Sequence, residues 1–343
     1  MIFYIILYSI LGEKVLLINL SDNFKLFRLY CWALNYINIY RKLKGSDDFQ
    51  MSTKNNEFCP LIAYKERSSR AIVREAIDLI KSEKAKKLNA IWLEVTGCSG
   101  NIISFLNSEN PGLDYILTEL INLKYNNTLM NSEGEYAFKE FLNTLKTEFI
   151  LLIDGAVSTA ENGFYNIVAN YNGKPVTALD AVKMAGEKAK YVLAVGTCAS
   201  YGGISAAKPN PSASKSVKEV LNREIIRLPG CPCHPDWVVG TLASLIAFGK
   251  SQLDDEGRPL LFYGITIHDA CSRRGFFEKR IFAKKFGEEG CMFKLGCRGP
   301  VTKTDCPRRK WNGYVNWPVE DNTNCIGCAN SRFPDGMEPF VRY

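Results

Sequence analysis

The sequence predicts an α/β protein in which a doubly wound parallel sheet is followed by an irregular segment of short helices and loops. Apolar stretches typical of buried strands alternate with helical stretches through the middle of the chain. Three cysteines each follow one of these strands by a few residues. The C-terminal part then combines many cysteines with few long apolar runs.

The first 50 residues differ from the rest, and we expect them to be an upstream extension that precedes the true start at Met51. Apolar runs in residues 1–20 are broken at Gly12 and Lys14 and are shorter than the roughly 20 residues that a spanning helix needs. A secretory signal would have a basic start and a small-residue cleavage site, which are missing here. A short interfacial anchor is the alternative. We expect no function for Cys31 and Cys59.

Residues 51–88 are expected to form an N-terminal helical arm. Apolar side chains recur at helical spacing over 70–87, opposite a charged face. This pattern predicts a surface helix or an arm that docks on a partner.

The expected sheet domain spans residues 89–252. Buried strands are predicted at 90–95, 149–153, 191–195 and 224–228, and helices at 101–106, 178–189 and 235–248. Because strands alternate with helices, the strands are expected to be parallel.

Cys98, Cys198 and Cys231 each follow the C-terminal end of a predicted strand, with a glycine one or two residues before the cysteine. Ligands of open α/β sheets bind at this edge, so we expect the three thiols to converge there. Glycines suit such a site because they let the backbone approach a bound group closely. Small core cysteines are the alternative interpretation.

The C-terminal domain, residues 253–343, is predicted to bind metal at two centres. Its segment has little apolar periodicity, so metal bonds would supply the folding free energy that burial cannot. Spacing divides the ligands into a set of four and a set of three, and three thiolates suit a cluster that lacks one iron. The alternatives are a pair of zinc ribbons or a disulfide framework. The two sets are His268, Cys271, Cys291 and Cys297, followed by Cys306, Cys325 and Cys328.

Several function classes are disfavoured. The net charge of +7 is modest and the basic residues are dispersed, which argues against nucleic-acid binding. Neither a P-loop nor a G-x-G-x-x-G turn occurs, and only two histidines are present, so nucleotide binding and hydrolase chemistry have little support. The 12 cysteines are placed like ligands in a long chain, which favours a reducing compartment.

Taken together, these residues resemble the small, electron-transferring subunit of nickel-iron hydrogenases. The resemblance extends from about residue 89 to the C-terminus. The matching motifs are Trp92-Leu-Glu ahead of Cys98, Gly196-Thr-Cys-Ala-Ser-Tyr-Gly-Gly, Leu228-Pro-Gly-Cys-Pro, Pro235-Asp-Trp, His268-Asp-Ala-Cys-Ser-Arg-Arg, Lys294-Leu-Gly-Cys-Arg-Gly-Pro, Cys306-Pro, Asn316-Trp-Pro and Cys325-Ile-Gly-Cys.

The resemblance implies a flavodoxin-like sheet domain followed by an irregular, mostly α/loop iron-sulphur domain. It implies a proximal 4Fe-4S cluster at Cys98, Cys198 and Cys231, a distal 4Fe-4S cluster at the four-ligand set and a medial 3Fe-4S cluster at the three-ligand set. Pro318 matches a position that binds no iron in the family. The nickel-iron centre, and with it the H2 chemistry, would lie in a separate large subunit.

One position departs from the family pattern. The family has Cys-x-x-Cys at the proximal site, whereas this chain has Asn101 at the second position. An amide is a poor iron ligand beside a thiolate, so the motif leaves the identity of the fourth proximal ligand undecided. Cys233 is the nearest substitute; Asn101 itself, solvent, or a cluster that lacks one iron are the others.

The implied role is an electron wire between the large subunit and a carrier such as a ferredoxin or cytochrome. The basic run Arg298, Lys303, Arg308, Arg309 and Lys310 is a candidate for steering an acidic carrier, with a solvated face as the alternative. A subunit of a quinone-reductase-type complex, a degenerate or regulatory paralogue and a zinc-binding interaction module are rival hypotheses. We expect a cytoplasmic location because no twin-arginine signal is found, with membrane association as the alternative.

Overall fold

The computed structural model describes residues 4–8, 15–19 and 69–336. The chain divides into two compact units, Met1–Glu66 and Arg67–Tyr343. In the first unit, β1 (Tyr4–Tyr8) pairs with β2 (Val15–Asn19) as an antiparallel hairpin. The expected start at Met51, Cys31 and Cys59 lie outside the described residues.

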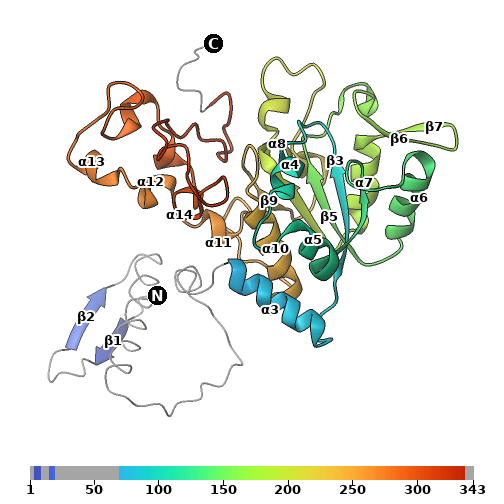
Figure 1. The fold of residues 1–343 in the computed structure, drawn as a ribbon, viewed down its shortest axis with the longest axis horizontal. Coiled ribbons are helices and arrows are strands. Elements are labelled where there is room, and N and C mark those ends of the chain that lie inside the picture. Colours follow the sequence, from blue (N-terminus) through green and yellow to red (C-terminus); the bar gives the residue numbers. More distant parts are fainter. Residues whose placement is uncertain (1–3, 9–14, 20–68, 337–343) are drawn as a thin grey trace. The chain divides into compact units, whose positions relative to one another are not determined.

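The second unit is built on a five-stranded parallel sheet with the strand order β4-β3-β5-β8-β9 (Figure 1). Numbered along the chain from β3, this order is 2-1-3-4-5, which is the flavodoxin-like arrangement. The predicted fold class is therefore confirmed. The strands are β3 (Leu88–Glu94), β4 (Ile121–Asn126), β5 (Phe149–Asp154), β8 (Tyr191–Val195) and β9 (Ile226–Leu228).

Helices cover both faces of the sheet, so alternate strand residues enter two different cores. Trp92 and Leu152 pack in a cluster beneath α3 and α10, while Ile91 and Leu151 pack beneath α6 and α7 (Figure 1). These strands are buried on both faces and read as nearly continuous apolar runs, as parallel strands do. The longer helices are α3 (Ser69–Lys81), α6 (Gly134–Thr144), α7 (Ala178–Lys188) and α10 (Pro235–Phe248).

Helix α3 is amphipathic, as expected, but it belongs to the helical layer of the sheet. Its apolar residues, among them Ile72 and Ala76, are buried in the cluster that also contains α10 residues. The helix ends at Lys81 and does not reach residue 87. Glu83 takes a left-handed backbone (φ 58°), the amide of Lys84 bonds to the carbonyl of Leu79, and the chain then enters β3.

Several elements were not expected from the sequence. Strand β4 lies at one edge of the sheet, and its alternating polar residues lack the apolar run that marks the central strands. Strand β9 begins at Ile226, not at residue 224. Short or irregular elements complete this part: α4 (Gly100–Leu106), α5 (Leu113–Tyr115), η1 (Ile116–Leu120), η2 (Ala160–Gly163), the antiparallel pair β6 (Ile167–Tyr171) and β7 (Lys174–Thr177), α8 (Gly196–Tyr201), η3 (Gly203–Ala206) and α9 (Val217–Val220).

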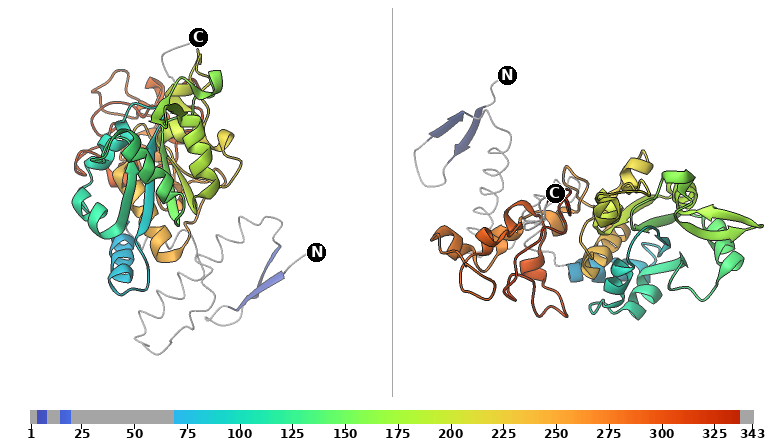
Figure 2. Two further views of the ribbon diagram at one scale, coloured as in Figure 1. Left: turned by 90° about the vertical axis from the view of Figure 1, so that its right-hand side faces the viewer. Right: turned by 90° about the horizontal axis from the view of Figure 1, so that it is seen from above.

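The C-terminal segment consists of short helices joined by loops, as the sequence predicted, and it lies beside the sheet (Figure 2). In the described part of the chain, no helix combines the length and apolar character needed to cross a bilayer. The short helices are α11 (Leu260–Tyr263), α12 (Ile267–Ala270), α13 (Arg274–Glu278), η4 (Met292–Leu295), η5 (Gly299–Val301) and α14 (Cys306–Arg309).

A largely buried ionic network joins this segment to the sheet domain. Arg309 Nη1 donates to Asp236 Oδ2 at 2.7 Å, and its Nη2 donates to Asp305 Oδ2 at 2.6 Å. Trp237 Nε1 donates to the other oxygen of Asp305 at 2.8 Å. Because Asp305 precedes Cys306 and Asp236 begins α10, the network fixes a predicted metal ligand relative to the sheet.

We predict that Arg309→Met strongly destabilises the protein. Removing the guanidinium leaves two buried carboxylates without their cation, and breaking a buried pair in this way costs about 3–5 kcal/mol. The midpoint of urea unfolding, followed by circular dichroism, measures the loss.

Lys190→Met is the matched control for the Arg309 prediction. Its ammonium pairs with Glu148 at 2.9 Å on the surface, where such a pair contributes about 0–1 kcal/mol. Equal effects from the two substitutions would mean that the Arg309 network does not hold the segment in place.

Candidate metal centres

The three predicted proximal cysteines leave the sheet at its carboxyl edge. Cys98 follows β3, Cys198 lies in the first turn of α8 directly after β8, and Cys231 follows β9. The strand order reverses between β3 and β5, and this switch point is where such sheets form their binding crevice. Cys98 is exposed, whereas Cys198 and Cys231 are half-buried.

The electrostatics of Cys231 show that these thiols are neighbours. Its pKa is raised to about 12, first by burial and then by the negative charges of Cys328, Cys198 and Cys98. A Cβ added at Gly203 would lie 3.0 Å from Cys198 Sγ, and one at Gly100 would lie 3.1 Å from Cys98 Sγ. The glycines thus keep the space beside two of the thiols clear.

Asn101 is held among three loops at this edge and is buried. Its Nδ2 donates to Asp154 Oδ1 at 2.6 Å, and its Oδ1 accepts the amide hydrogen of Cys233 at 2.7 Å. Gly196 packs so closely on the carboxamide that a Cβ there would collide with it. Asn101 therefore connects the ends of β5 and β8 with the loop after β9.

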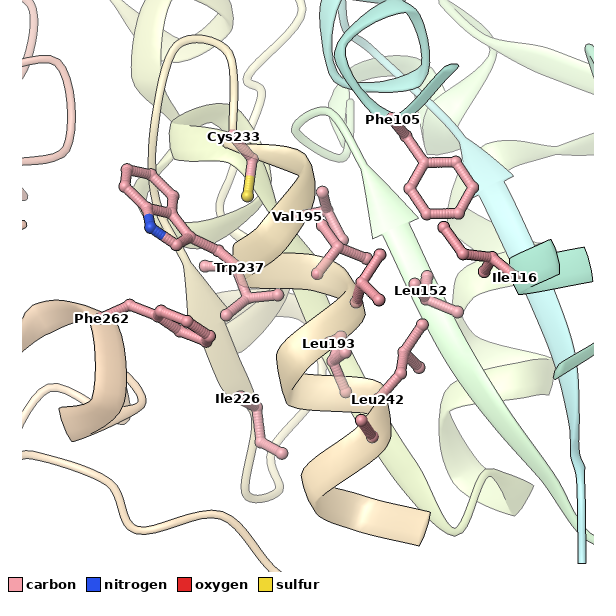
Figure 3. Packing of buried hydrophobic residues seen from close by; sticks show 14 of the residues in the cluster. Phe105, Ile116, Leu152, Leu193, Val195, Ile226, Cys233, Trp237, Leu242 and Phe262 are labelled. Carbon is pink, nitrogen blue, oxygen red and sulfur yellow. The ribbon is translucent and has the colours of Figure 1, made fainter. Parts of the chain in front are cut away.

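Cys233, the other candidate for the fourth proximal ligand, lies in the apolar core. It is only 1% exposed, and its sulfur points toward Trp237 and Val195 (Figure 3). Burial raises the pKa of its thiol well above the usual value. Its Sγ donates to the carbonyl of His234 at 3.6 Å.

Asp154 was missed by the sequence analysis, although it directly follows the predicted strand 149–153 and is the last residue of β5. Burial, with a smaller contribution from Glu94, raises the pKa of its carboxyl to about 7, against the hydrogen bond from Asn101. Within the described ranges, its Oδ2 and Glu94 Oε1 have no hydrogen-bond partner. Two acidic side chains thus end neighbouring strands beside the proximal cysteines.

The medial set is buried between the sheet and the C-terminal loops. Burial is the main cause of a pKa of about 12 for Cys306 and of the raised pKa values of Cys325 and Cys328. The charge of Cys328 raises the pKa of both other thiols, so the three are close neighbours. Thr304 Oγ1 donates to Cys306 Sγ at 3.2 Å, and the amide of Gly327 donates to Cys325 Sγ at 3.4 Å. Pro318 is exposed.

The four residues of the distal set line one small hollow. The amide of Arg273 donates to Cys271 Sγ at 3.4 Å, and the ring of His268 meets Phe277 edge-on at 4.6 Å. These contacts orient two of the four side chains before any metal is bound. The lining residues that carry a thiol or an imidazole are His268, Cys271, Cys291 and Cys297.

Neighbouring sets are also connected to each other. The backbone amide of Cys231 acts to lower the pKa of the Cys328 thiol against the effect of burial, so the proximal and medial sets are neighbours. Thr197 Oγ1 donates to the carbonyl of Cys328 and accepts the amide hydrogen of Gly230 at 2.9 Å. The charge of Cys297 contributes to the raised pKa of Cys325, so the distal and medial sets are neighbours too.

The donor set fits iron-sulfur clusters. Soft thiolates with amide hydrogens directed at the sulfurs are what such clusters bind. Within the described ranges, no three His, Cys, Asp or Glu side chains converge closely enough to hold a single metal ion. Thiolates that bind a cluster are spaced more widely than the ligands of one ion, because each binds a different iron atom.

The basic run proposed to steer a carrier is partly engaged inside the protein. Arg309 belongs to the buried network with Asp236 and Asp305, and Lys310 pairs with Glu320 at 3.0 Å. Lys303 and Arg308 are exposed. Arg298 and Lys310 are half-buried.

Comparison with known proteins identifies the family. A family model for the C-terminal part of the NiFe/NiFeSe hydrogenase small subunit matches residues 263–341. The periplasmic NiFeSe hydrogenase small subunit of Desulfomicrobium baculatum is 40% identical over 279 residues, which cover 76% of this chain and 88% of that protein. This chain belongs to the nickel-iron hydrogenase small subunits.

Solved structures of hydrogenases agree with this assignment. The H2-activated NiFeSe hydrogenase of Desulfomicrobium baculatum matches with a TM-score of 0.71 at 39% identity, over 75% of this chain and 99% of that chain. The recombinant NiFeSe hydrogenase of Desulfovibrio vulgaris Hildenborough matches with a TM-score of 0.71 at 36% identity, over 75% and 98%. As a hydrogenase small subunit, the chain is part of an oxidoreductase that pairs with a large subunit, and its family implies iron-sulfur clusters.

A second family model, that of the 20 Kd subunit of NADH ubiquinone oxidoreductase, matches residues 98–245 of the hydrogenase small subunit. This range contains the sheet strands β4, β5, β8 and β9 and the proximal cysteines, but not β3 and none of the distal or medial set. The rival prediction of a quinone-reductase-type subunit is therefore supported by the sheet domain alone. The match of the hydrogenase model to residues 263–341 distinguishes the two families.

The loop that carries Cys231 should be sensitive to acid through His234. This side chain caps α10: Nδ1 accepts the amide hydrogen of Asp236 at 3.1 Å, and Nε2 bonds to the carbonyl of Lys310 at 2.9 Å. Burial lowers the pKa of His234 to about 4. The unfolded chain then binds more protons than the folded one between about pH 6.5 and pH 4, so stability falls as the pH falls through this window.

We predict that His234→Asn makes stability less dependent on pH. Asn keeps an acceptor at the helix N-cap but does not titrate. The loss of stability between pH 7.5 and pH 5 should shrink by about 2 kcal/mol. Thermal unfolding at both pH values measures this difference, and an unchanged difference would contradict a neutral, buried His234.

Proposed function

We propose that this hydrogenase small subunit passes electrons through three iron-sulfur clusters between a nickel-iron site in the large subunit and an external carrier. The clusters would be a proximal 4Fe-4S centre, a medial 3Fe-4S centre and a distal 4Fe-4S centre, held by the three ligand sets described above. These clusters supply one-electron transfer during H2 oxidation or H+ reduction.

The observation that carries the proposal is the order of the ligand sets. Thr197, beside Cys198, donates to the carbonyl of Cys328. The amide of Arg298, beside Cys297, donates to the carbonyl of Cys325 at 2.7 Å, so each set adjoins the next. A series of neighbouring redox centres is what electron transfer over a long distance requires, because tunnelling falls steeply with distance. A structural zinc module would have no need of three adjoining sets.

The residues around the proximal set support docking of the large subunit there. Ile103 in α4 and Ile204 in η3 follow Cys98 and Cys198 at the sheet edge, and they are 57% and 58% exposed. Exposed apolar side chains beside a redox centre favour burial against a partner. We propose that they contact the large subunit.

The residues around the distal set support an acidic carrier, such as a ferredoxin, at the other end. Lys279, Arg280 and Lys284 are exposed on the chain between Cys271 and Cys291. Positive charge near the terminal centre would speed the encounter with an acidic protein. A His ligand at that end would leave the cluster less negative than a fourth thiolate would.

We predict iron and acid-labile sulfide in the anaerobically purified complex. Electron paramagnetic resonance should show a 3Fe-4S signal in the oxidised complex and coupled 4Fe-4S signals after dithionite. Cys325→Ser should remove the first signal, because the medial cluster loses one of its three thiolates. Zinc in place of iron, with silent spectra, would overturn the electron-transfer proposal in favour of a structural module.

We predict that Ile103→Glu with Ile204→Glu weakens assembly with the large subunit at least tenfold. A charge placed in an apolar interface must be desolvated without a partner. Co-purification and sedimentation of the two subunits measure the effect.

Phe248→Glu is the matched control for subunit assembly, since Phe248 is 41% exposed at the C-terminal end of α10, away from the ligand loops. If Phe248→Glu weakened assembly while the isoleucine variants did not, the large subunit would bind elsewhere.

A further inference from the structure

We propose that the proximal cluster is bound by only three protein thiolates, Cys98, Cys198 and Cys231, and that Asn101 positions their loops without binding iron. The corner of the cluster that faces Asn101 then carries a solvent oxygen or lacks its iron. This inference rests on the proposed function, since it takes a cluster at this edge as given. It concerns Asn101, which stands where the family resemblance implies the second cysteine of a Cys-x-x-Cys motif.

The orientation of the Asn101 carboxamide is fixed by its partners. The amide nitrogen of Cys233 can only donate, so the atom 2.7 Å from it must be the oxygen of Asn101. The amino group therefore faces Asp154, 2.6 Å from Oδ1. The amide nitrogen of Asn101 has no lone pair to offer iron, and its oxygen already accepts the amide hydrogen of Cys233.

The same contacts explain what Asn101 does instead. A fourth thiolate would have tied the loop after β3 to the other ligand loops through the cluster. Asn101 ties it to Asp154 at the end of β5 and to Cys233, two residues beyond Cys231. The close approach of Gly196 adds contact with the turn that leads to Cys198. Two hydrogen bonds and this packing contact thus replace one metal bond.

Cys233 does not replace the missing thiolate. Its side chain is 1% exposed among Trp237, Val195 and other core residues (Figure 3). Its own amide is held by Asn101, and the next residue, His234, caps α10. Turning this sulfur toward Cys98 would require the cap, the Asn101 bond and the core packing to change together.

Asp154 is the remaining side chain with an oxygen at this edge. It ends β5 inside the sheet ladder, opposite Glu94, and is 2% exposed. Its Oδ1 accepts the Asn101 amino group, which places Asn101 between Asp154 and the ligand loops. Asp154 therefore orients Asn101. Whether Asp154 itself binds iron is tested with its own variant.

The first experiment uses the wild-type complex, so it does not depend on any variant folding. The complex is purified anaerobically, exchanged into water labelled with oxygen-17, and studied by electron-nuclear double resonance. Oxygen-17 coupling on a 4Fe-4S signal, or a second 3Fe-4S signal, supports three thiolates and an open corner. Four-iron clusters without oxygen-17 coupling overturn the proposal.

The second experiment compares Mössbauer spectra of iron-57 complexes from wild type and variants. Subtracting the spectra cancels the medial and distal clusters. Cys233→Ala and Asp154→Asn should leave every iron site unchanged, and Asn101→Ala should lower proximal cluster occupancy without changing the coordination that remains. Asn101→Cys should convert one iron site per complex to the thiolate type and lower the proximal reduction potential, because a thiolate adds negative charge.

These outcomes separate the residues. A change at one iron site in Cys233→Ala, Asp154→Asn or Asn101→Ala would identify that side chain as the fourth ligand and overturn the inference. If Asn101→Cys left every iron site unchanged, Asn101 would not face the cluster, and the inference would again be overturned. Cys98→Ser is the positive control, since it must alter one site. If the wild-type complex held no iron-sulfur cluster at all, the proposed function would fail first.

Discussion

The parallel register of β3, β5, β8 and β9 is the constraint on which the proximal site depends. Parallel strands end at one edge, so residues more than 100 positions apart in the chain leave the sheet side by side. Cys98, Cys198 and Cys231 need no further device to become neighbours. The loops then refine the site in two ways. Their glycines leave room beside the sulfurs. Asn101 connects three of the loop ends through its contacts.

Burial of the thiols links folding to cluster assembly. Burial and neighbouring charge raise the pKa values of Cys231 and Cys306 to about 12, so these groups hold their protons in the folded chain without metal. Cluster binding must displace those protons, because thiolates are the ligands. The buried guanidinium of Arg309 is committed to Asp236 and Asp305 and offers the thiols no salt bridge. Iron would then supply the positive charge that balances the thiolates of these sets.

The sequence predicts the central strands and most ligand positions because both have strong local signals. Continuous apolar runs mark β5 and β8, and cysteines directly after strands mark the sheet edge. The edge strand β4 has no such run, since only part of it is buried, and α3 gives no sign that its apolar face packs on α10. The roles of Asn101 and Asp154 depend on contacts between residues 53 positions apart, which no local pattern encodes. The domain boundary at 252/253, the ligand assignments and the cellular location stay predictions.

Thr197 holds the loops of the proximal and medial sets together through hydrogen bonds. Its hydroxyl donates to the carbonyl of Cys328 and accepts the amide hydrogen of Gly230, while its own amide donates to the carbonyl of Gly230 at 3.0 Å. Loops tied at two points fluctuate together, so thermal motion would change their separation little. Since tunnelling depends exponentially on separation, occasional close approaches dominate the average rate when two centres move independently. For two centres carried by these loops, the electron-transfer rate would instead vary little over time. It would also depend only weakly on temperature.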